Sequence, residues 1–158
     1  MVTMPGLPMI GHSQIEGFEE KYGMEYRRAY WNEHPEQGFI ERHKYDIFPL
    51  MHKRYLFSGV ENFYLYDYYN SEGNVNENVF AYSNQFGNER ALVFYNNSYE
   101  NTAGWTQLSS AFKDKISDSL KQMNIGVGLG LTNGTDLYLI FCEHKSDLEF
   151  IRILYDIF

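Results

Sequence analysis

The sequence predicts an α+β fold in which a strand and helices come first and an antiparallel β-sheet follows. Three observations support this prediction. The chain opens on an apolar run with polar residues directly after it, residues 39–57 place apolar side chains at helical spacing, and aromatic β-prone segments begin after residue 60. The 158 residues suffice for one domain, or for a small domain plus a fragment, so we expect segments 1–60 and 61–158.

The opening run is punctuated by Pro and Gly and delivers polar side chains at its end. In parallel α/β proteins a buried strand presents a site at its carboxyl end in this way. We therefore expect a strand before Gly11, with its neighbours supplied by other chains or by a larger polypeptide of which this chain is the tail. The polar residues near that strand end, His12, Gln14, Glu16 and Tyr22, are the candidates for contacting a ligand.

Helical patterns follow the opening run. Residues 15–22 and 24–31 suggest short helices, which Gly17 and Gly23 keep from joining. Residues 39–57 predict a helix that is kinked, or replaced by a second helix, near Pro49.

The pattern changes to β-structure after residue 60. Residues 63–69 are aromatic and β-prone, and residues 79–83 and 91–95 predict a hairpin centred on Gly87. Residues 105–112 are a further candidate strand.

The last part of the chain mixes signals. Residues 116–123 suggest a short amphipathic helix, and residues 137–142 predict a strand. Residues 148–154 fit either a strand or a helix. In the glycine-rich stretch 126–130 the third glycine comes one residue earlier than in a nucleotide-binding loop, so we expect a flexible connection. The apolar end of the chain has no polar cap, which suggests truncation.

Composition narrows the function. The net charge of −8 argues against nucleic acids and anionic membranes as partners, and no apolar run approaches the ~20 residues of a membrane span. The start of the chain has no signal-peptide pattern, so we expect a soluble, cytoplasmic protein. Glu16, Glu19 and Glu20 are predicted to form a solvated acidic face. The single Cys142 cannot form an internal disulfide. We expect no cofactor and no metal, because none of the histidines has a metal-ligand spacing: His12, His34, His43, His52 and His144.

Two segments resemble the alpha-amylase superfamily of glycoside hydrolases. Residues 5–17 resemble the eighth barrel strand of that family, with Gly6, Pro8 and the apolar pair 9–10 matching, whereas the positions from Gly11 to Gln14 depart from its aromatic and acidic pattern. Residues 78–97 look like the first hairpin of its carboxyl-terminal antiparallel domain. Residues 11–31 look like a bacterial subgroup of these glycosidases.

The resemblance implies the end of a (β/α)8 barrel over residues 1–60 and an antiparallel β-sheet or sandwich domain over residues 61–158. The family uses an Asp nucleophile, a Glu general acid and a second Asp, all on earlier barrel strands. No position of this chain matches them, so the chain alone is expected not to hydrolyse glycosides. The intact protein would act on α-glucosidic bonds by a retaining mechanism, and an α-glucan would be contacted by His12, Gln14, Glu16 and Tyr22.

A different hypothesis is a non-catalytic carbohydrate-binding or protein-interaction module. Exposed aromatic rings on one sheet face stack well against sugars, but packing of a core accounts for the same rings and is the favoured interpretation. The candidates are Tyr64, Tyr66, Tyr68, Tyr82 and Trp105. Exposed barrel edges would in addition favour a homo-oligomer.

Overall fold

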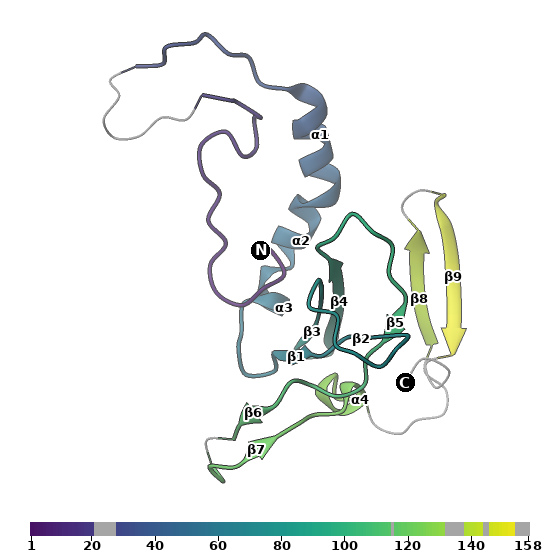
Figure 1. Cartoon of the computed structure of the whole chain (residues 1–158). Helices are drawn as coiled ribbons and strands as arrows, with labels where there is room; N and C mark the ends of the chain where they lie inside the picture. Colours follow the sequence, from purple (N-terminus) through teal and green to yellow (C-terminus); the bar gives the residue numbers. More distant parts are fainter. Residues whose placement is uncertain (21–27, 115, 132–137, 144–145, 154–158) are drawn as a thin grey trace. The chain divides into compact units, whose positions relative to one another are not determined.

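The computed structural model describes residues 1–20, 28–114, 116–131, 138–143 and 146–153. The chain divides into two compact units, Met1–Val60 and Glu61–Phe158, at the position where the hydrophobic pattern changes. The fold is α+β: the described residues of the first unit form three helices, and those of the second unit form mainly small antiparallel sheets (Figure 1). The described residues form no barrel.

The predicted opening strand is wrong, because residues 1–20 form turns and extended stretches without strand pairing. The guanidinium group of Arg54 explains this. It donates hydrogen bonds to the backbone carbonyls of Val2 (2.6 Å), Met4 (2.9 Å) and Gly6. Gly6 has a φ of 93° and donates its own N–H to the carbonyl of Ser58 (3.3 Å). The opening carbonyls are therefore bound by one side chain instead of by a neighbouring strand.

The helix predicted over residues 15–22 is also wrong as far as residue 20, where the described part ends. Ser13 and Gly17 both have positive φ, and the N–H of Gly17 donates to the carbonyl of Ser13 (2.8 Å), which closes a turn. Residues 28–31 form bends and no helix, and the rest of the predicted helix 24–31 lies outside the described residues.

The helical prediction for residues 39–57 is confirmed, with breaks. Helices α1 (Gln37–Asp46), α2 (Phe48–His52) and α3 (Arg54–Phe57) follow one another (Figure 1). Pro49 lies in the first turn of α2, where its missing N–H has no partner to lose. The Glu36 carboxylate caps α1 by accepting from the N–H groups of Gly38 (3.1 Å) and of the next residue.

The central sheet of the second unit has the order β1-β3-β4, with all neighbours antiparallel. Its strands are β1 (Tyr64–Tyr66), β3 (Val79–Phe86) and β4 (Glu89–Asn96). The predicted hairpin is confirmed: Gly87, at φ 57°, supplies the left-handed conformation that the two-residue turn requires.

A second, two-stranded sheet pairs β2 (Tyr69–Asn70) with β5 (Gly104–Trp105). The expected strand over residues 63–69 is thus divided between β1 and β2. The expected strand over residues 105–112 is reduced to β5 and the start of β6 (Phe112–Lys113).

The predicted helix over residues 116–123 is wrong, because β6 pairs there with β7 (Leu120–Lys121). The Asp114 carboxylate accepts hydrogen bonds from the Ile116 N–H (3.0 Å) and the Ser117 hydroxyl (2.8 Å), and so closes a turn where a helix would begin.

The glycine-rich stretch is also more ordered than predicted, because it contains helix α4 (Ile125–Gly128). The Asn124 side chain caps the helix by accepting from the Gly126 N–H (2.9 Å).

Strands β8 (Tyr138–Glu143) and β9 (Leu148–Ile153) form an antiparallel hairpin. This confirms the strand predicted at residues 137–142 over its described part. It also decides between strand and helix for the last segment, whose described residues form a strand.

The core of the second unit lies between the central sheet and α4. Tyr66, Ala81, Ile125 and Leu129 form the buried cluster. The Tyr66 hydroxyl lies 2.7 Å from the Ser83 hydroxyl, and both residues are buried. Burial raises the pKa of the Tyr66 phenol, although its hydrogen bond to Ser83 acts in the opposite direction.

Candidate functional site

The first unit contains an open, mainly apolar pocket of about 380 Å³. One wall is formed by Phe39, His43 and Ile47, which follow one another at intervals of four along α1 and its cap and therefore share a helix face. The opening segment supplies the rest of the lining: Met1, Val2, Ile10, Gln14 and Ile15.

The polar side chains of this pocket are bound to the backbone. The Gln14 side-chain oxygen accepts from the Gly11 N–H (2.6 Å), and His43 Nδ1 lies 2.9 Å from the Phe39 carbonyl oxygen. The rings of Phe39 and His43 also meet edge to face, with centroids 4.4 Å apart. Because none of the lining residues is acidic, the pocket offers apolar contact and no pair of carboxyl groups.

The four residues predicted to contact a ligand do not lie together in one site. Gln14 lines the pocket, whereas His12 packs its ring against Phe18 at a centroid distance of 5.6 Å. Glu16 uses its backbone carbonyl to accept from the N–H of Glu36 (2.9 Å). Tyr22 lies outside the described residues. Gln14 therefore belongs to the lining of this pocket, whereas His12 and Glu16 do not.

Two glutamates form a clasp that sequence reasoning missed. The Glu20 carboxylate accepts from the backbone N–H groups of Tyr30 (2.8 Å) and Trp31 (2.9 Å). The Glu33 carboxylate accepts in return from the N–H groups of Glu19 (2.8 Å) and Glu20 (3.1 Å). Glu20 therefore binds the backbone and does not belong to a solvated acidic face. Its hydrogen-bond partners lie too far away in the sequence for a short motif to predict them.

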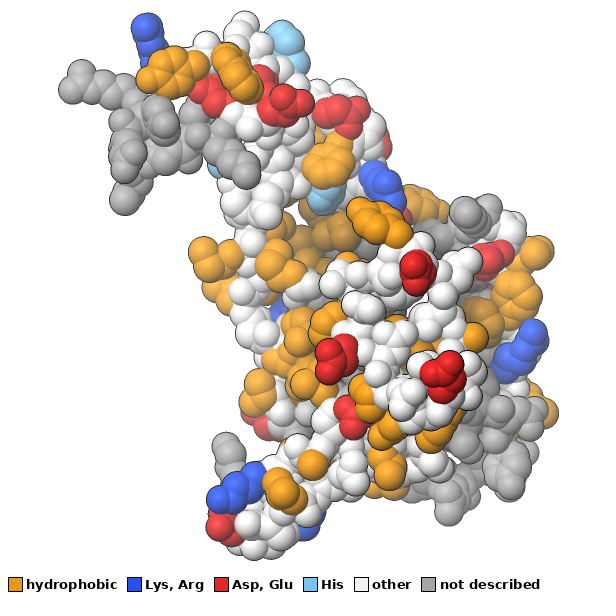
Figure 2. Space-filling model, in the orientation of Figure 1, with side chains coloured by type: hydrophobic (Ala, Val, Ile, Leu, Met, Phe, Trp, Pro, Cys, Tyr) orange, Lys and Arg blue, Asp and Glu red, His pale blue; other side chains and the backbone are white. Residues whose placement is uncertain are grey.

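In the second unit the structure separates buried from exposed aromatic candidates. Tyr66 and Tyr82 are buried, which assigns them to packing, and Tyr64 and Tyr68 are partly buried. Trp105 is 52% exposed. Figure 2 shows hydrophobic side chains at the visible surface of this unit with acidic side chains among them.

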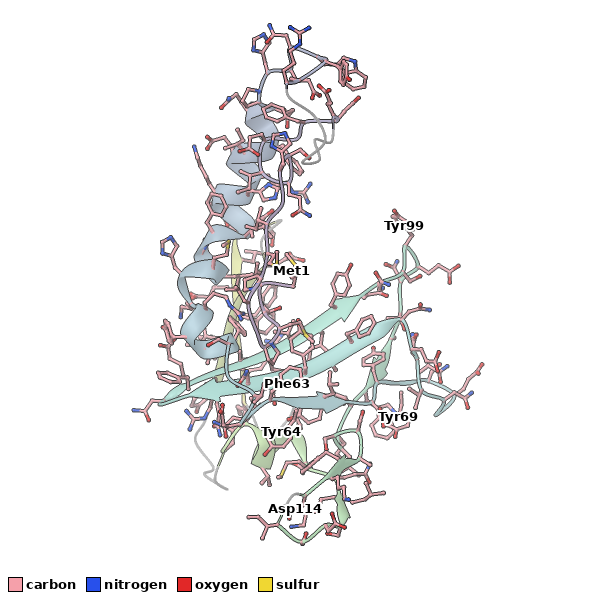
Figure 3. The ribbon with its side chains drawn as sticks, turned by 90° about the vertical axis from the view of Figure 1, so that its left-hand side faces the viewer. Met1, Phe63, Tyr64, Tyr69, Tyr99 and Asp114 are labelled. Carbon is pink, nitrogen blue, oxygen red and sulfur yellow. The ribbon has the colours of Figure 1, made fainter. Side chains whose placement is uncertain are left out.

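Trp105 has a stacking partner that sequence reasoning did not single out. It lies directly opposite Tyr69 across the β2–β5 pair, with ring centroids 4.8 Å apart and planes inclined by 22°. Figure 3 shows Tyr69 at the end of the second unit away from Tyr64. A Cβ at Gly104 would lie 2.1 Å from the Tyr69 carbonyl oxygen, so only glycine permits this close pairing.

Other kinds of site find no support in the described part of the chain. It contains no group of three or more His, Cys, Asp or Glu side chains placed to hold a metal ion. Its helices are too short or too polar to cross a bilayer. Comparison with protein families, curated proteins and solved structures found no match to the chain.

Proposed function

We propose that this chain is the carboxyl-terminal, non-catalytic part of an alpha-amylase-like glycosidase that acts on α-glucosidic bonds in its intact form. The β3–β4 hairpin carries the proposal. It joins an aromatic strand through a two-residue turn to the Arg-apolar-Leu-Val strand that the resemblance implies. In this proposal the first unit corresponds in sequence to the end of the barrel, and α1–α3 to its last helices. The second unit corresponds to the antiparallel domain of the enzyme.

The absence of catalysis by this chain follows from the chemistry of glycoside cleavage. A retaining glycosidase needs an acid and a nucleophile, with the two carboxyl groups about 5–5.5 Å apart across the scissile bond. The Glu20 and Glu33 carboxylates each accept two backbone N–H groups, so their oxygens hold the backbone together. In this proposal neither glutamate supplies the acid or the nucleophile.

The test is hydrolysis of a chromogenic maltoside by the purified chain, with an authentic α-amylase as the positive control. We expect no turnover above the buffer blank, and turnover would refute the proposal. A second measurement separates the proposal from mere inactivity. The coding region before Met1 should encode barrel strands bearing an Asp nucleophile and a Glu acid, and an unrelated coding region there would also refute it.

We also propose that the chain self-associates. In the β8–β9 hairpin the neighbouring residues Ile140 and Phe141, which point to opposite faces, are 59% and 43% exposed. A two-stranded hairpin that is apolar on both faces is marginally stable in water and favours association. Light scattering at micromolar concentration should give a dimer or larger species, and a strictly monomeric mass would contradict this proposal.

A second candidate function is a carbohydrate-binding module. One observation favours it: the half-exposed Trp105 ring is held parallel to Tyr69 at the surface of the second unit. Binding of soluble starch without turnover is the expected behaviour of such a module.

A further inference from the structure

We propose that strand β4 pairs along its outer edge with β4 of a second copy of the chain, in an antiparallel arrangement around a twofold axis. The inference deepens the proposed self-association and rests on it, because it names a surface that makes the contact. On this surface, in contrast to the apolar β8–β9 hairpin, backbone hydrogen bonds carry the recognition.

The two edges of the central sheet differ. On the β1 edge the chain covers its own backbone, because the Ser110 N–H donates to the carbonyl of Leu65 (2.8 Å) and Ser109 forms a bridge with Tyr66. On the β4 edge, no strand of the described residues pairs with the outer side of β4. One edge is therefore protected within the chain, and the other is available for pairing.

The hydrogen-bond pattern determines which groups of β4 point outward. The Asn97 N–H donates to the carbonyl of Asn78 (2.8 Å), and bonded pairs recur at every second residue of an antiparallel ladder. Val93 therefore bonds to β3, whereas Leu92 and Phe94 turn their N–H and C=O groups away from it. No hydrogen bond of the described residues uses these outward groups.

The outer edge of β4 lacks the features that usually keep an edge strand from pairing. Residues 91–97 contain no charged side chain and no proline, and the β3–β4 register runs without a bulge. Phe94 is 51% exposed and Tyr95 is 55% exposed, so apolar surface flanks the unpaired backbone groups. An edge of this kind favours the addition of another strand.

A second copy fits this edge because the edge is self-complementary. When Val93 lies opposite itself on the twofold axis, Leu92 lies opposite Phe94 of the second copy, and the reverse pair forms on the other side of the axis. Each of these pairs can exchange both of its outward backbone hydrogen bonds. The same register brings Ala91 opposite Tyr95 of the second copy, so apolar side chains meet on both faces of the new pair.

Charge favours the same arrangement. The net charge of −8 opposes the association of two copies in general, so the contact has to avoid like charges. In this register Glu89 faces Asn97 of the second copy. Arg90 faces Asn96 of the second copy, so neither charged residue of β4 lies opposite a like charge. Because β4 is already extended, it also loses less entropy on pairing than a flexible peptide would.

Disulfide trapping in the full chain tests the register. In a Cys142→Ser background, Val93→Cys places two thiols opposite each other in a pair without backbone hydrogen bonds, where the Cα atoms approach to about 4.5 Å. We expect oxidation by air to yield a covalent dimer. Ala91→Cys is the matched control, because Ala91 lies on the same face of the same strand but away from the axis. It should cross-link at least about tenfold less.

Charge exchange tests the same contact without a thiol. Val93→Lys and Val93→Glu each place like charges on the axis, so each should raise the dimer dissociation constant in analytical ultracentrifugation by at least about tenfold. An equimolar mixture of the two variants should recover the affinity of the parent chain, which misfolded variants could not do. Ile116→Lys is the control for an added charge, because Ile116 is 97% exposed and lies outside the central sheet. It should associate as the parent chain does.

The outcomes distinguish the β4 edge from self-association in general. A parent chain that is monomeric at micromolar concentration would overturn both. An oligomer that survives both charge variants, or that cross-links equally through Ala91→Cys and Val93→Cys, would overturn the β4 edge while self-association stands. A mixture of the charge variants that stays dissociated, together with a Val93→Cys variant that does not cross-link, would also overturn the edge.

Discussion

Replacing Tyr66 by Phe removes one hydroxyl from the core of the second unit and leaves the Ser83 hydroxyl without its partner. The two oxygens lie 2.7 Å apart, with Tyr66 4% and Ser83 0% exposed, so water cannot substitute for either group without rearrangement. A buried polar group that loses its partner destabilises a protein by about 1–3 kcal/mol. We expect Tyr66→Phe and Ser83→Ala each to lower the free energy of unfolding by an amount in this range.

The double variant decides whether the hydrogen bond is the cause. Removing both hydroxyls leaves no unsatisfied group, so the double variant should lose at least about 1 kcal/mol less than the sum of the single losses. Urea unfolding followed by Trp105 fluorescence, in a Trp31→Phe background, reports on the second unit. Tyr99→Phe is the control, because Tyr99 is fully exposed and its loss should change stability by less than about 0.5 kcal/mol. Additive single losses would refute the reasoning.

The same pair makes a pH prediction. The pKa of Tyr66 is raised above its ordinary value of 10.0 in the folded state, so the folded protein holds this proton more tightly than the unfolded chain does. The stability contribution is therefore complete below pH 10 and is lost as the pH rises from 10 through the folded pKa. In Tyr66→Phe this part of the alkaline loss should be absent, and an identical alkaline profile in both proteins would contradict the assignment.

Three further predictions test other contacts. Arg54→Lys keeps the charge but loses the planar group that binds three carbonyls, so the free energy of unfolding of the first unit in urea should fall by about 1–3 kcal/mol. The Gly6 amide should also exchange faster with deuterium, and unchanged exchange would contradict this. Gly104→Ala should separate β2 from β5 and abolish the near-ultraviolet circular dichroism of the stacked aromatic pair, whereas an unchanged spectrum would show that the close approach is relieved elsewhere. The pKa of Asp114 lies below its ordinary 3.8, chiefly because of the hydrogen bond from Lys121 and then those from the Ile116 N–H and the Ser117 hydroxyl. The free energy of unfolding should therefore fall as the pH drops below 3.8, and Asp114→Asn should flatten this pH dependence.

Local patterns predicted the parts of the fold that local chemistry determines. The β3–β4 hairpin follows from two alternating segments and Gly87, and the break between α1 and α2 follows from Pro49. The opening segment could not be predicted in the same way, because Arg54, which binds its carbonyls, lies about 50 residues away. A turn likewise forms at Asp114 where a helix was expected, because its carboxylate accepts hydrogen bonds from neighbouring donors.

The site shows the same division. Gln14 lines the pocket, although the strand end from which it was named does not form, and its contact with a ligand stays a prediction. The pairing of Tyr69 with Trp105 depends on a register between segments more than 30 residues apart, and no short motif encodes that register. Glu33, which binds the N–H groups of Glu19 and Glu20, could not be predicted from a short motif either, because its partners are distant in the sequence.

The reciprocal clasp of Glu20 and Glu33 has a consequence for engineering the chain. It joins the backbone at residues 19–20 to the backbone at residues 30–31 through four hydrogen bonds. Variants engineered in the first unit should therefore keep both carboxylates, because the loss of either one leaves two backbone N–H groups without this acceptor.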